Sequence, residues 1–441
     1  MNQPTKRPAG PPSTRRTFLK STAGLVGATV AGASVLSRNV HAAGSDVLKL
    51  GLVGCGGRGA GAAANALTAD PNTRLTAVGD AFADQAEKAV KLLSEKFNDR
   101  VAVDPEHRFA GFDAHKQVIA SGVDVVLLAT PPHFRPMHLK ACIEAGKHVF
   151  AEKPVAVDAP GIRSVLATCD AAKEKGLSVV SGLMYRHDPG MKETIRRLRD
   201  GAIGRIVAVQ ETYNVGPPWF RNRDRQAGWT EMEYQMRNWY PFTWLSGDHN
   251  VEQHVHSLDK AAWLLGDVPP ERAWGSGGRQ VRSEIALGHI FDHHCVTYEY
   301  ADGVRVYSHC RRIAGCYNNV SDVFLGAEGT CDLMKCRIDG PKPWRYEGPK
   351  TNKYVIEHEV LLKSVRDGRP VNDGLHMTGS TMLAVIGRMA TYTGKAITWE
   401  QAMNSQEDLS PARYAWDADP PILPDENGRY PIAAPGVTEF K

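Results

Sequence analysis

The chain has 441 residues, of which 42% are hydrophobic and 23% charged, a globular composition with enough length for two domains. Its formal net charge of +4 is unevenly distributed: residues 1–42 hold six of the 53 basic residues and none of the 49 acidic ones. The remainder therefore carries 47 basic and 49 acidic residues, a net charge of −2. This balance gives no reason to expect nucleic acid as a partner.

The first 42 residues have the three parts of a signal peptide. The segment Thr14-Arg15-Arg16-Thr17-Phe18-Leu19-Lys20 closely matches the twin-arginine pattern. A mildly apolar stretch over 21–36 follows, too short for a membrane span of ~20 strongly apolar residues. Val40-His41-Ala42 then forms a small-x-small cleavage site. We expect the twin-arginine machinery to export the protein to the periplasm without a stable membrane anchor; an uncleaved anchor or a disordered arm is the alternative.

The eight cysteines contain no Cys-x-x-Cys pair. Because the twin-arginine route is expected to export chains already folded in a reducing cytoplasm, few disulfides are expected. We interpret Cys55, Cys142 and Cys169 as small buried residues. A disulfide stays open among Cys310, Cys316, Cys331 and Cys336.

Short apolar segments alternate with helical ones in the next part of the chain. The expected strands are Val47–Val53, Arg74–Val78, Val123–Thr130 and His148–Ala151. The expected helices are Ala60–Leu67, Asp84–Phe97 and Met137–Ala145. Repeated strand–helix units indicate a parallel sheet, so we predict an α/β fold that begins with a Rossmann domain over residues 43–170.

The rest of the chain is richer in strands. Helices at Ala159–Lys175 and Met191–Arg199 surround a strand at Leu177–Leu183, and later helices are expected at about 250–265, 355–366 and 378–393. Strands His289–Tyr300 and Val304–Cys310 flank the turn Asp302-Gly303, a strong hairpin signal. We predict an α/β domain with a largely antiparallel or mixed open sheet over 171–416, for substrate binding and oligomerisation, and an extended tail over 417–441.

The strongest motif is Gly54-Cys55-Gly56-Gly57-Arg58-Gly59, a G-x-G-x-x-G between a strand and a helix. Glycines let the backbone turn tightly and approach a pyrophosphate at the helix N-terminus. Asp80 ends the next strand, where a carboxylate binds the ribose hydroxyls and repels a 2′-phosphate. We therefore predict NAD as the cofactor, with NADP less favoured; a turn that serves only packing is the alternative.

A second motif, Ala151-Glu152-Lys153-Pro154, ends the fifth expected strand. Ligands bind at the carboxyl ends of strands in an open α/β sheet, which places Lys153 near the nicotinamide. Burial and the cationic ring would lower the pKa of Lys153 and make proton transfer to an alcohol oxygen plausible. A surface lysine before a strand-ending proline is the structural alternative.

The third motif begins at Gly247-Asp248-His249-Asn250 and continues to Asp259. If residues 250–265 form one helix, Glu252, His256 and Asp259 lie together beside the apolar stripe. A carboxylate four residues before a histidine can orient the ring and raise its basicity. We therefore predict Glu252 and His256 as catalytic partners, whereas a purely structural histidine is the alternative.

Together these motifs, with Trp263-Leu264-Leu265-Gly266 after the helix, resemble the Gfo/Idh/MocA oxidoreductases, which include glucose–fructose oxidoreductase and inositol dehydrogenase. The resemblance runs from about Leu48 to Thr398 and is greatest for relatives exported by the twin-arginine route. It implies hydride transfer between a sugar or cyclitol carbon and the nicotinamide, with Lys153 and His256 handling the proton.

The resemblance also assigns neighbouring residues. It places Thr130-Pro131-Pro132-His133 along the ribose and nicotinamide, and Tyr185-Arg186 on the substrate side. Many members have Asp where this chain has Glu252, so this carboxylate could pair with His256 or face the substrate.

An aromatic and basic stretch, residues 219–244, precedes the third motif. Aromatic faces with polar neighbours suit sugar rings, and they equally suit a subunit contact in the homo-oligomer that we expect. Its tryptophans and arginines are Trp219, Trp229, Trp239, Trp244, Arg221, Arg223, Arg225 and Arg237. From this region and the third motif we predict Trp239, His249 and Gln253 as substrate contacts.

A metal site is conceivable because seven histidines lie between residues 249 and 309. They are His249, His254, His256, His289, His293, His294 and His309. No pair has a recognised ligand spacing, and His293 and His294 would point to opposite faces of a strand, so we predict no metal.

Three functions remain open. The first is a sugar, glycoside or cyclitol oxidoreductase that keeps its NAD tightly bound, because free cofactor should be scarce outside the cytoplasm. The second is an NAD-dependent glycosidase of the same family, which oxidises a ring carbon only transiently. The third is a non-catalytic protein that binds sugar or cofactor.

Overall fold

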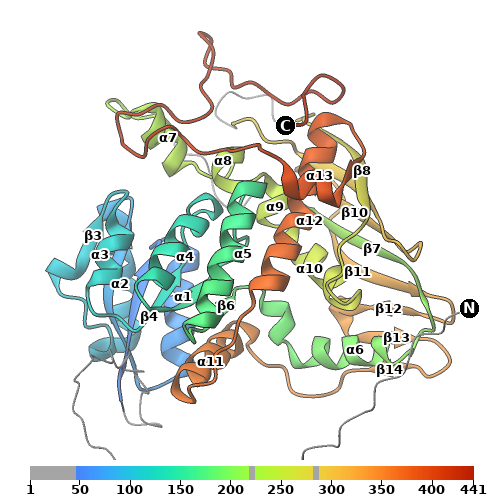
Figure 1. Cartoon of the computed structure of the whole chain (residues 1–441), viewed down its shortest axis with the longest axis horizontal. Helices are drawn as coiled ribbons and strands as arrows, with labels where there is room; N and C mark the ends of the chain where they lie inside the picture. Colours follow the sequence, from blue (N-terminus) through green and yellow to red (C-terminus); the bar gives the residue numbers. More distant parts are fainter. Residues whose placement is uncertain (1–45, 218–223, 282–287) are drawn as a thin grey trace, which may run out of the picture. The chain divides into compact units, whose positions relative to one another are not determined.

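The computed structural model describes residues 46–217, 224–281 and 288–441, so the predicted signal peptide lies outside the described part. The described residues belong to one compact unit that contains two sheets (Figure 1). No helix within these ranges is long and apolar enough to cross a membrane.

Six parallel strands form the first sheet, in the order β3-β2-β1-β4-β5-β6. Its strands are β1 (Leu48–Val53), β2 (Thr73–Asp80), β3 (Arg108–Ala110), β4 (Val125–Leu128), β5 (His148–Ala151) and β6 (Val179–Ser181). Strand β4 is buried at every residue, as expected for a parallel strand covered on both faces. The order reverses between β1 and β4, which is where open α/β sheets bind ligands. The predicted Rossmann sheet is confirmed.

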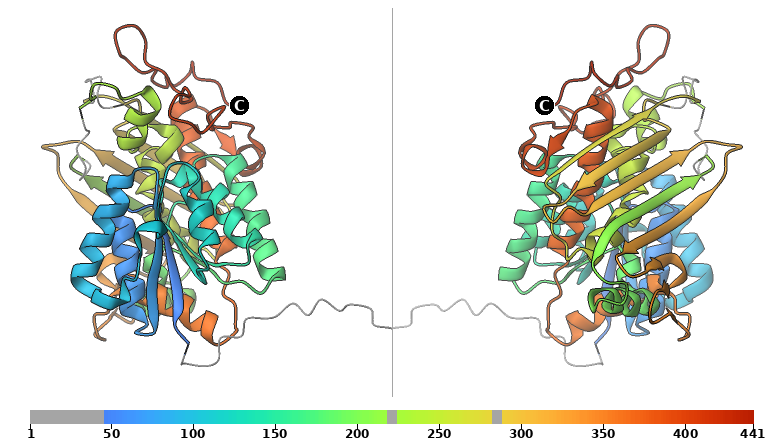
Figure 2. Two further views of the ribbon diagram at one scale, coloured as in Figure 1. Left: turned by 90° about the vertical axis from the view of Figure 1, so that its left-hand side faces the viewer. Right: turned by 90° about the vertical axis from the view of Figure 1, so that its right-hand side faces the viewer.

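Helices cover both faces of this sheet (Figure 2). One face packs against α1 (Gly57–Ala69), α2 (Ala83–Phe97) and α11 (Lys353–Arg366). The other packs against α3 (Ala114–Ala120), α4 (Arg135–Glu144) and α5 (Ala159–Glu174). The nucleotide domain therefore does not end at residue 170, because β6 pairs with β5 and α11 returns from much later in the chain to cover β1 and β5.

Nine strands form the second sheet, in the order β14-β13-β12-β11-β7-β10-β9-β8-β15. Only β7 and β10 run parallel to each other among these pairs, so the predicted antiparallel or mixed sheet is confirmed. Its strands are β7 (Ile206–Val215), β8 (Arg272–Gly278), β9 (His293–Glu299), β10 (Arg305–Arg312), β11 (Asn319–Gly326), β12 (Thr330–Asp332), β13 (Arg337–Asp339), β14 (Trp344–Arg345) and β15 (Ile397–Thr398).

The predicted hairpin joins β9 and β10, and Gly303 in its turn has a φ of 82°, a conformation that favours glycine. One face of the second sheet packs on α6 (Pro189–Arg199), α10 (Val255–Leu264) and α12 (Gly374–Thr393). Helix α12 also contacts α5, and this contact joins the two domains. The right-hand view of Figure 2 shows the opposite face of this sheet without a covering helix.

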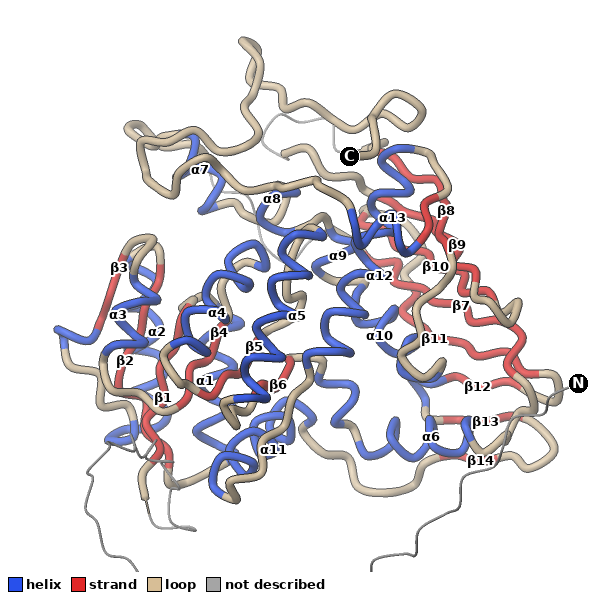
Figure 3. Tube along the Cα trace, viewed as in Figure 1, coloured by secondary structure: helices blue, strands red, loops and turns tan. Residues whose placement is uncertain are grey.

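The last helix, α13 (Trp399–Asn404), is followed by a tail in which the structure has neither helix nor strand (Figure 3). The tail returns to the first domain, where Tyr414 and Trp416 contact Phe112 at centroid distances of 6.1 and 4.6 Å. All eight cysteines are free, and Cys55, Cys142 and Cys169 are buried as predicted.

Candidate active site

The glycine motif links β1 to α1 through a turn that tolerates no side chain at two of its positions. Gly54 has a φ of 92°, and a Cβ atom on Gly59 would lie 1.8 Å from the Gly54 carbonyl oxygen. The loop therefore packs directly against the first turn of α1, whose N-terminal N–H groups form an anion-binding site.

A cavity of about 530 Å³ opens at this loop and extends along the carboxyl ends of the first-sheet strands to residues of the second domain. Most predicted cofactor residues line it: Gly54, Gly56, Gly57, Arg58, Gly59, Asp80, Thr130, Pro131, Glu152 and Lys153. His256, Glu252 and Trp239 line the same cavity, so both the cofactor motif and the predicted catalytic residues face one space.

Asp80 connects the glycine loop to the end of β2. Its Oδ2 accepts a hydrogen bond from the Cys55 N–H at 2.6 Å, and its Oδ1 accepts one from the Phe82 N–H at 3.0 Å. Burial raises the pKa of Asp80, while the two backbone donors oppose that shift. The carboxylate thus lies where a ribose beside the loop would meet it.

Lys153 and Glu252 form an ion pair between the two domains. Lys153 Nζ donates to the Glu252 carbonyl oxygen at 2.6 Å and to its Oε1 at 3.0 Å. Both side chains are largely buried, with exposed fractions of 13% and 8%. The preceding carboxylate, Glu152, instead forms an ion pair with Arg58, whose Nε lies 2.8 Å from Glu152 Oε1. Each glutamate thereby fixes one cation on the cavity wall.

The predicted single helix over 250–265 is wrong. The structure has a short helix α9 (His249–Glu252), a break at Gln253, and then α10 from Val255. Glu252 and His256 consequently lie on different helices, and Glu252 pairs with Lys153 rather than with the histidine. The third carboxylate of that motif, Asp259, is also turned away, because it binds Arg186 at 2.8 Å.

His256 lines the cavity as a neutral ring. Burial, followed by the charge of Lys153, lowers its pKa well below the usual value. Its Nδ1 is buried and has no hydrogen-bond partner in the part of the chain that the structure describes. The rings of Tyr185 and His256 form a T-shaped contact with a centroid distance of 5.5 Å. The Lys260 ammonium group lies over the Tyr185 ring.

Five predicted contacts lie outside the cavity lining, and four of them are held by other residues. Arg186 is held by Asp259 and Asp267, and His133 Nε2 lies 2.8 Å from the Tyr414 hydroxyl. Gln253 bonds to the Tyr213 hydroxyl at 2.8 Å. His249 lies in a buried cluster beside Asp248. Because these polar groups already interact with other residues of the protein, they do not point into the cavity. Tyr185 also lies outside the lining and contacts it only through His256.

The aromatic and basic stretch contributes in part. Arg237 and Trp239 both line the cavity. The Arg237 guanidinium carbon lies 3.9 Å from the centroid of the Phe82 ring. Trp244 is fully buried and donates to Gln235, so it is a core residue. Trp219, Arg221 and Arg223 lie outside the described residues.

Sequence reasoning missed several residues of the site. Arg135 is fully buried and donates to the carbonyls of Glu152 at 2.8 Å and Thr130 at 2.7 Å, which couples the two loops that line the cavity. Arg135 lies two residues after the predicted Thr130–His133 loop, so its position in the sequence could have indicated it. Tyr354, from α11, lies over Arg58 at 5.1 Å, and nothing near the motif indicated it. The remaining cavity residues that sequence did not assign include Phe82, Phe112, His115, His138, Met184 and Met236.

The comparisons with known proteins agree with this architecture. Residues 48–182 match the model of an oxidoreductase family with an NAD-binding Rossmann fold, Gfo/Idh/MocA. The aldose-aldose oxidoreductase of Caulobacter crescentus is a structural neighbour with a TM-score of 0.62 and 19% identity, over 80% of this chain and 99% of that one. The WlbA dehydrogenase of Bordetella pertussis, solved with NADH and UDP-GlcNAcA, also has a TM-score of 0.62, with 19% identity over 80% and 98%.

The curated relatives cover less. Inositol 2-dehydrogenase 4 of Saccharopolyspora erythraea is 31% identical over 261 residues, 59% of this chain and 65% of that protein. The 2,7-anhydro-N-acetylneuraminate hydratase of Escherichia coli is 28% identical over 184 residues, 41% of this chain and 44% of that protein. The chain thus spans about half the length of such relatives.

The six-stranded parallel sheet and the glycine-loop cavity have the architecture of an NAD-binding Rossmann domain. Within these comparisons, residues 48–182 are similar to the Gfo/Idh/MocA family of oxidoreductases.

Proposed function

We propose that the protein is an NAD-dependent oxidoreductase that moves a hydride between a CH–OH carbon of a sugar, glycoside or cyclitol and the nicotinamide. One observation carries this proposal: the glycine loop and the Lys153–Glu252 pair line the same cavity, with His256 beside them. The residues fit a dinucleotide, because the loop excludes side chains at Gly54 and Gly59 and presents a helix N-terminus. Bound there, the nicotinamide supplies the hydride acceptor.

Lys153 and His256 would share the proton chemistry. An ammonium group has three N–H donors, and Glu252 takes two of those of Lys153, which leaves one for the substrate oxygen. A neutral imidazole has one acceptor nitrogen, so the lowered pKa of His256 suits it to receive the alcohol proton at neutral pH. Glu252 acts through Lys153 by fixing its ammonium group.

The nucleotide would be NAD rather than NADP. The Asp80 carboxylate at the end of β2 lies on the cavity wall, where its negative charge would repel a 2′-phosphate. Arg58 is the basic residue of the glycine loop, but it is paired with Glu152. No other described residue of that loop offers a positive charge.

We infer that the NAD is retained through the catalytic cycle, as an enzyme exported by the twin-arginine route would require. Segments that contact cavity residues from outside the glycine loop, which we call the roof, support this. We use that term for α7 (Glu231–Arg237) and the tail residues Tyr414 and Trp416. Arg237 lies over Phe82 at 3.9 Å, and Trp416 covers Phe82 and Phe112, two cavity residues, at centroid distances of 5.2 and 4.6 Å.

An NAD-dependent glycosidase is the second candidate. Among the relatives is a 2,7-anhydro-N-acetylneuraminate hydratase, whose name denotes a reaction other than net dehydrogenation. A transient oxidation at a ring carbon, followed by elimination and return of the hydride, would use the same cavity. Release of free sugar without net change in the bound nucleotide would favour this reaction.

Denaturing the purified protein and identifying the released nucleotide tests the proposal first. We expect NAD, and we expect at least one sugar or cyclitol to convert the bound nucleotide to its reduced, absorbing form. Lys153→Ala should retain the nucleotide and lose this conversion, because the substrate hydroxyl would lose the ammonium group that orients it and stabilises the negative charge that develops on its oxygen as the proton leaves. A protein that contains no nicotinamide nucleotide, or an activity unaffected by Lys153→Ala, would refute the assignment and leave a binding protein.

A further inference from the structure

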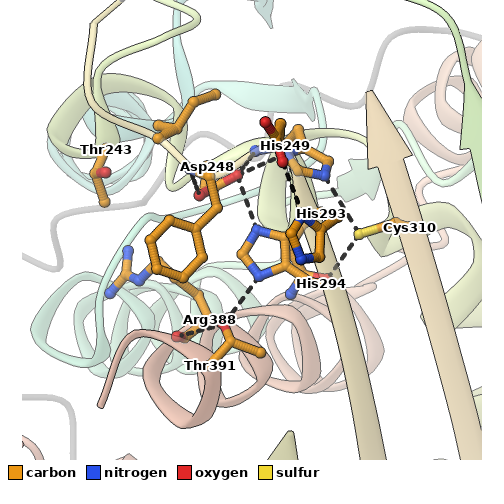
Figure 4. A network of polar contacts seen from close by, with 12 residues as sticks. Thr243, Asp248, His249, His293, His294, Cys310, Arg388 and Thr391 are labelled. Atoms are coloured by element: carbon orange, nitrogen blue, oxygen red, sulfur yellow. Dashed lines mark hydrogen bonds and ion pairs between the residues drawn. The ribbon is translucent and has the colours of Figure 1, made fainter. Parts of the chain in front are cut away.

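Asp248, His249 and His294 form a buried cluster that does not line the cavity (Figure 4). Asp248 precedes α9, His249 begins it, and His294 comes from β9. Their exposed fractions are 0%, 2% and 2%. His249 Nδ1 lies 2.8 Å and His294 Nε2 3.2 Å from the same atom, Asp248 Oδ1.

The hydrogen bonds of His294 determine which of its nitrogens carries the proton. The Thr391 hydroxyl donates within its own helix, to the carbonyls of Gly387 and Arg388 at 3.1 and 3.0 Å. It must therefore accept from His294 Nδ1, 2.9 Å away. A neutral imidazole has only one N–H, so Nε2 presents a lone pair to a carboxylate oxygen. Within the described residues, that contact also lacks the geometry of a hydrogen bond.

Asp248 and His249 are held in place by neighbouring residues that do not belong to the cluster. Asp248 Oδ2 accepts from the Tyr392 hydroxyl at 2.5 Å and from the Phe291 N–H at 3.0 Å, while Oδ1 accepts from the His249 backbone N–H and also faces the two imidazoles. The Cys310 thiol lies 3.5 Å from the outer nitrogen of His249, Nε2. Outer partners of this kind orient the ligands of metal sites.

We propose that Asp248, His249 and His294 bind a divalent metal ion, and that zinc fits their donors. The three side chains direct one ligand atom each to a common buried point, with these atoms within 4.8 Å of one another, and a buried carboxylate needs a compensating positive charge. Two imidazoles with one carboxylate are a common donor set for zinc. Three protein donors leave a fourth position for a water molecule. The ion fixes the start of α9, the helix whose last residue, Glu252, holds Lys153. Spacing along the chain could not indicate this site, because His294 joins it only through the fold.

Metal analysis of the full chain, with any affinity tag removed, tests the proposal. Protein from zinc-supplemented cells should contain about one zinc ion per chain by mass spectrometry. His294→Gln should reduce this to background. His293→Gln is the matched control, because His293 precedes it on β9 but points outward, with 39% of its side chain exposed, and binds Asp292. The control should keep its zinc.

Crystals of the wild-type protein give a second readout that needs no variant to fold. At the zinc absorption edge, an anomalous peak should lie between Asp248 Oδ1, His249 Nδ1 and His294 Nε2. The proposal is overturned if the wild-type protein holds no metal after growth with zinc, if the peak lies elsewhere, or if His294→Gln keeps its zinc. A metal-free wild-type protein would mean that a protonated imidazole supplies the positive charge.

Discussion

Lys153 Nζ lies 2.6 Å from the carbonyl oxygen and 3.0 Å from the carboxylate of Glu252, so the end of β5 is bonded directly to the end of α9. The nucleotide domain thereby supplies the ammonium group, and the second domain supplies the group that orients it. Proton transfer depends on that orientation, because a donor must be within hydrogen-bond reach of the substrate oxygen.

Glu252→Gln should lower kcat about tenfold and leave the bound NAD unchanged, because the carbonyl contact to Lys153 remains while the ion pair is lost. Steady-state kinetics and the nucleotide content after denaturation would measure both effects. Glu252→Asp keeps the charge and should recover part of the activity. Unchanged kcat in Glu252→Gln would contradict a positioning role.

Asp80→Asn should shift nucleotide preference toward NADP by about tenfold, since removing the carboxylate charge removes its repulsion of the 2′-phosphate. Protein stripped of nucleotide would be reloaded from an equal mixture of NAD and NADP, and the bound fraction separated by chromatography. Glu95→Gln is the control, because it removes a charge from an exposed position of α2 that does not line the cavity. The same NAD preference in Asp80→Asn as in the wild type would count against the predicted role.

Trp416→Ala should release bound NAD about ten times faster, because Trp416 covers the cavity residues Phe82 and Phe112. Nucleotide remaining after timed gel filtration would measure the rate. Trp274→Ala, on β8 and outside the cavity lining, should behave as the wild type. Equal retention in all three proteins would show that the roof does not hold the cofactor.

His358 should make the fold less stable in acid. Burial lowers its pKa in the folded state to about 3, below the usual 6.5, so between these values the unfolded chain binds a proton that the folded chain does not. Its contribution to stability is therefore present above pH 6.5 and is lost as the pH falls. From pH 7.5 to pH 5 the loss is about 2 kcal/mol.

Urea unfolding at the two pH values would compare the free energy of unfolding of the wild type with that of His358→Phe. The new phenyl ring can keep the contact with Phe150, whose ring centroid lies 4.2 Å from that of His358 in the wild type. The variant should show a smaller drop in the free energy of unfolding. An identical drop in both proteins would mean that His358 is protonated in the fold.

Local signals in the sequence were enough to predict which cofactor-side residues would lie together at one cavity. The glycine loop, Asp80 and Lys153 each sit at the end of a strand that is recognisable from its own residues, and the parallel sheet brings those ends to one edge.

The pairing of Glu252 could not be predicted, because it depends on a helix break without a glycine or proline. His254 donates its backbone N–H to His249, five residues back, and Gln253 is fixed by the Tyr213 hydroxyl from β7. The backbone hydrogen bond from His254 spans five residues instead of the usual four, so the chain between Glu252 and His256 does not continue as one regular helix. A contact made by a distant strand therefore overrode the helical period of the sequence.

Helix α11 also has a consequence for how the protein is made. It covers Leu50, Leu52 and Phe150, yet it begins only at Lys353 of a 441-residue chain. On the ribosome, one face of the nucleotide domain must therefore remain without its cover until most of the chain has been synthesised. Tyr354, which meets Arg58 beside the glycine loop, arrives with that same helix. Loading of the nucleotide would then be a late event that follows synthesis of most of the chain.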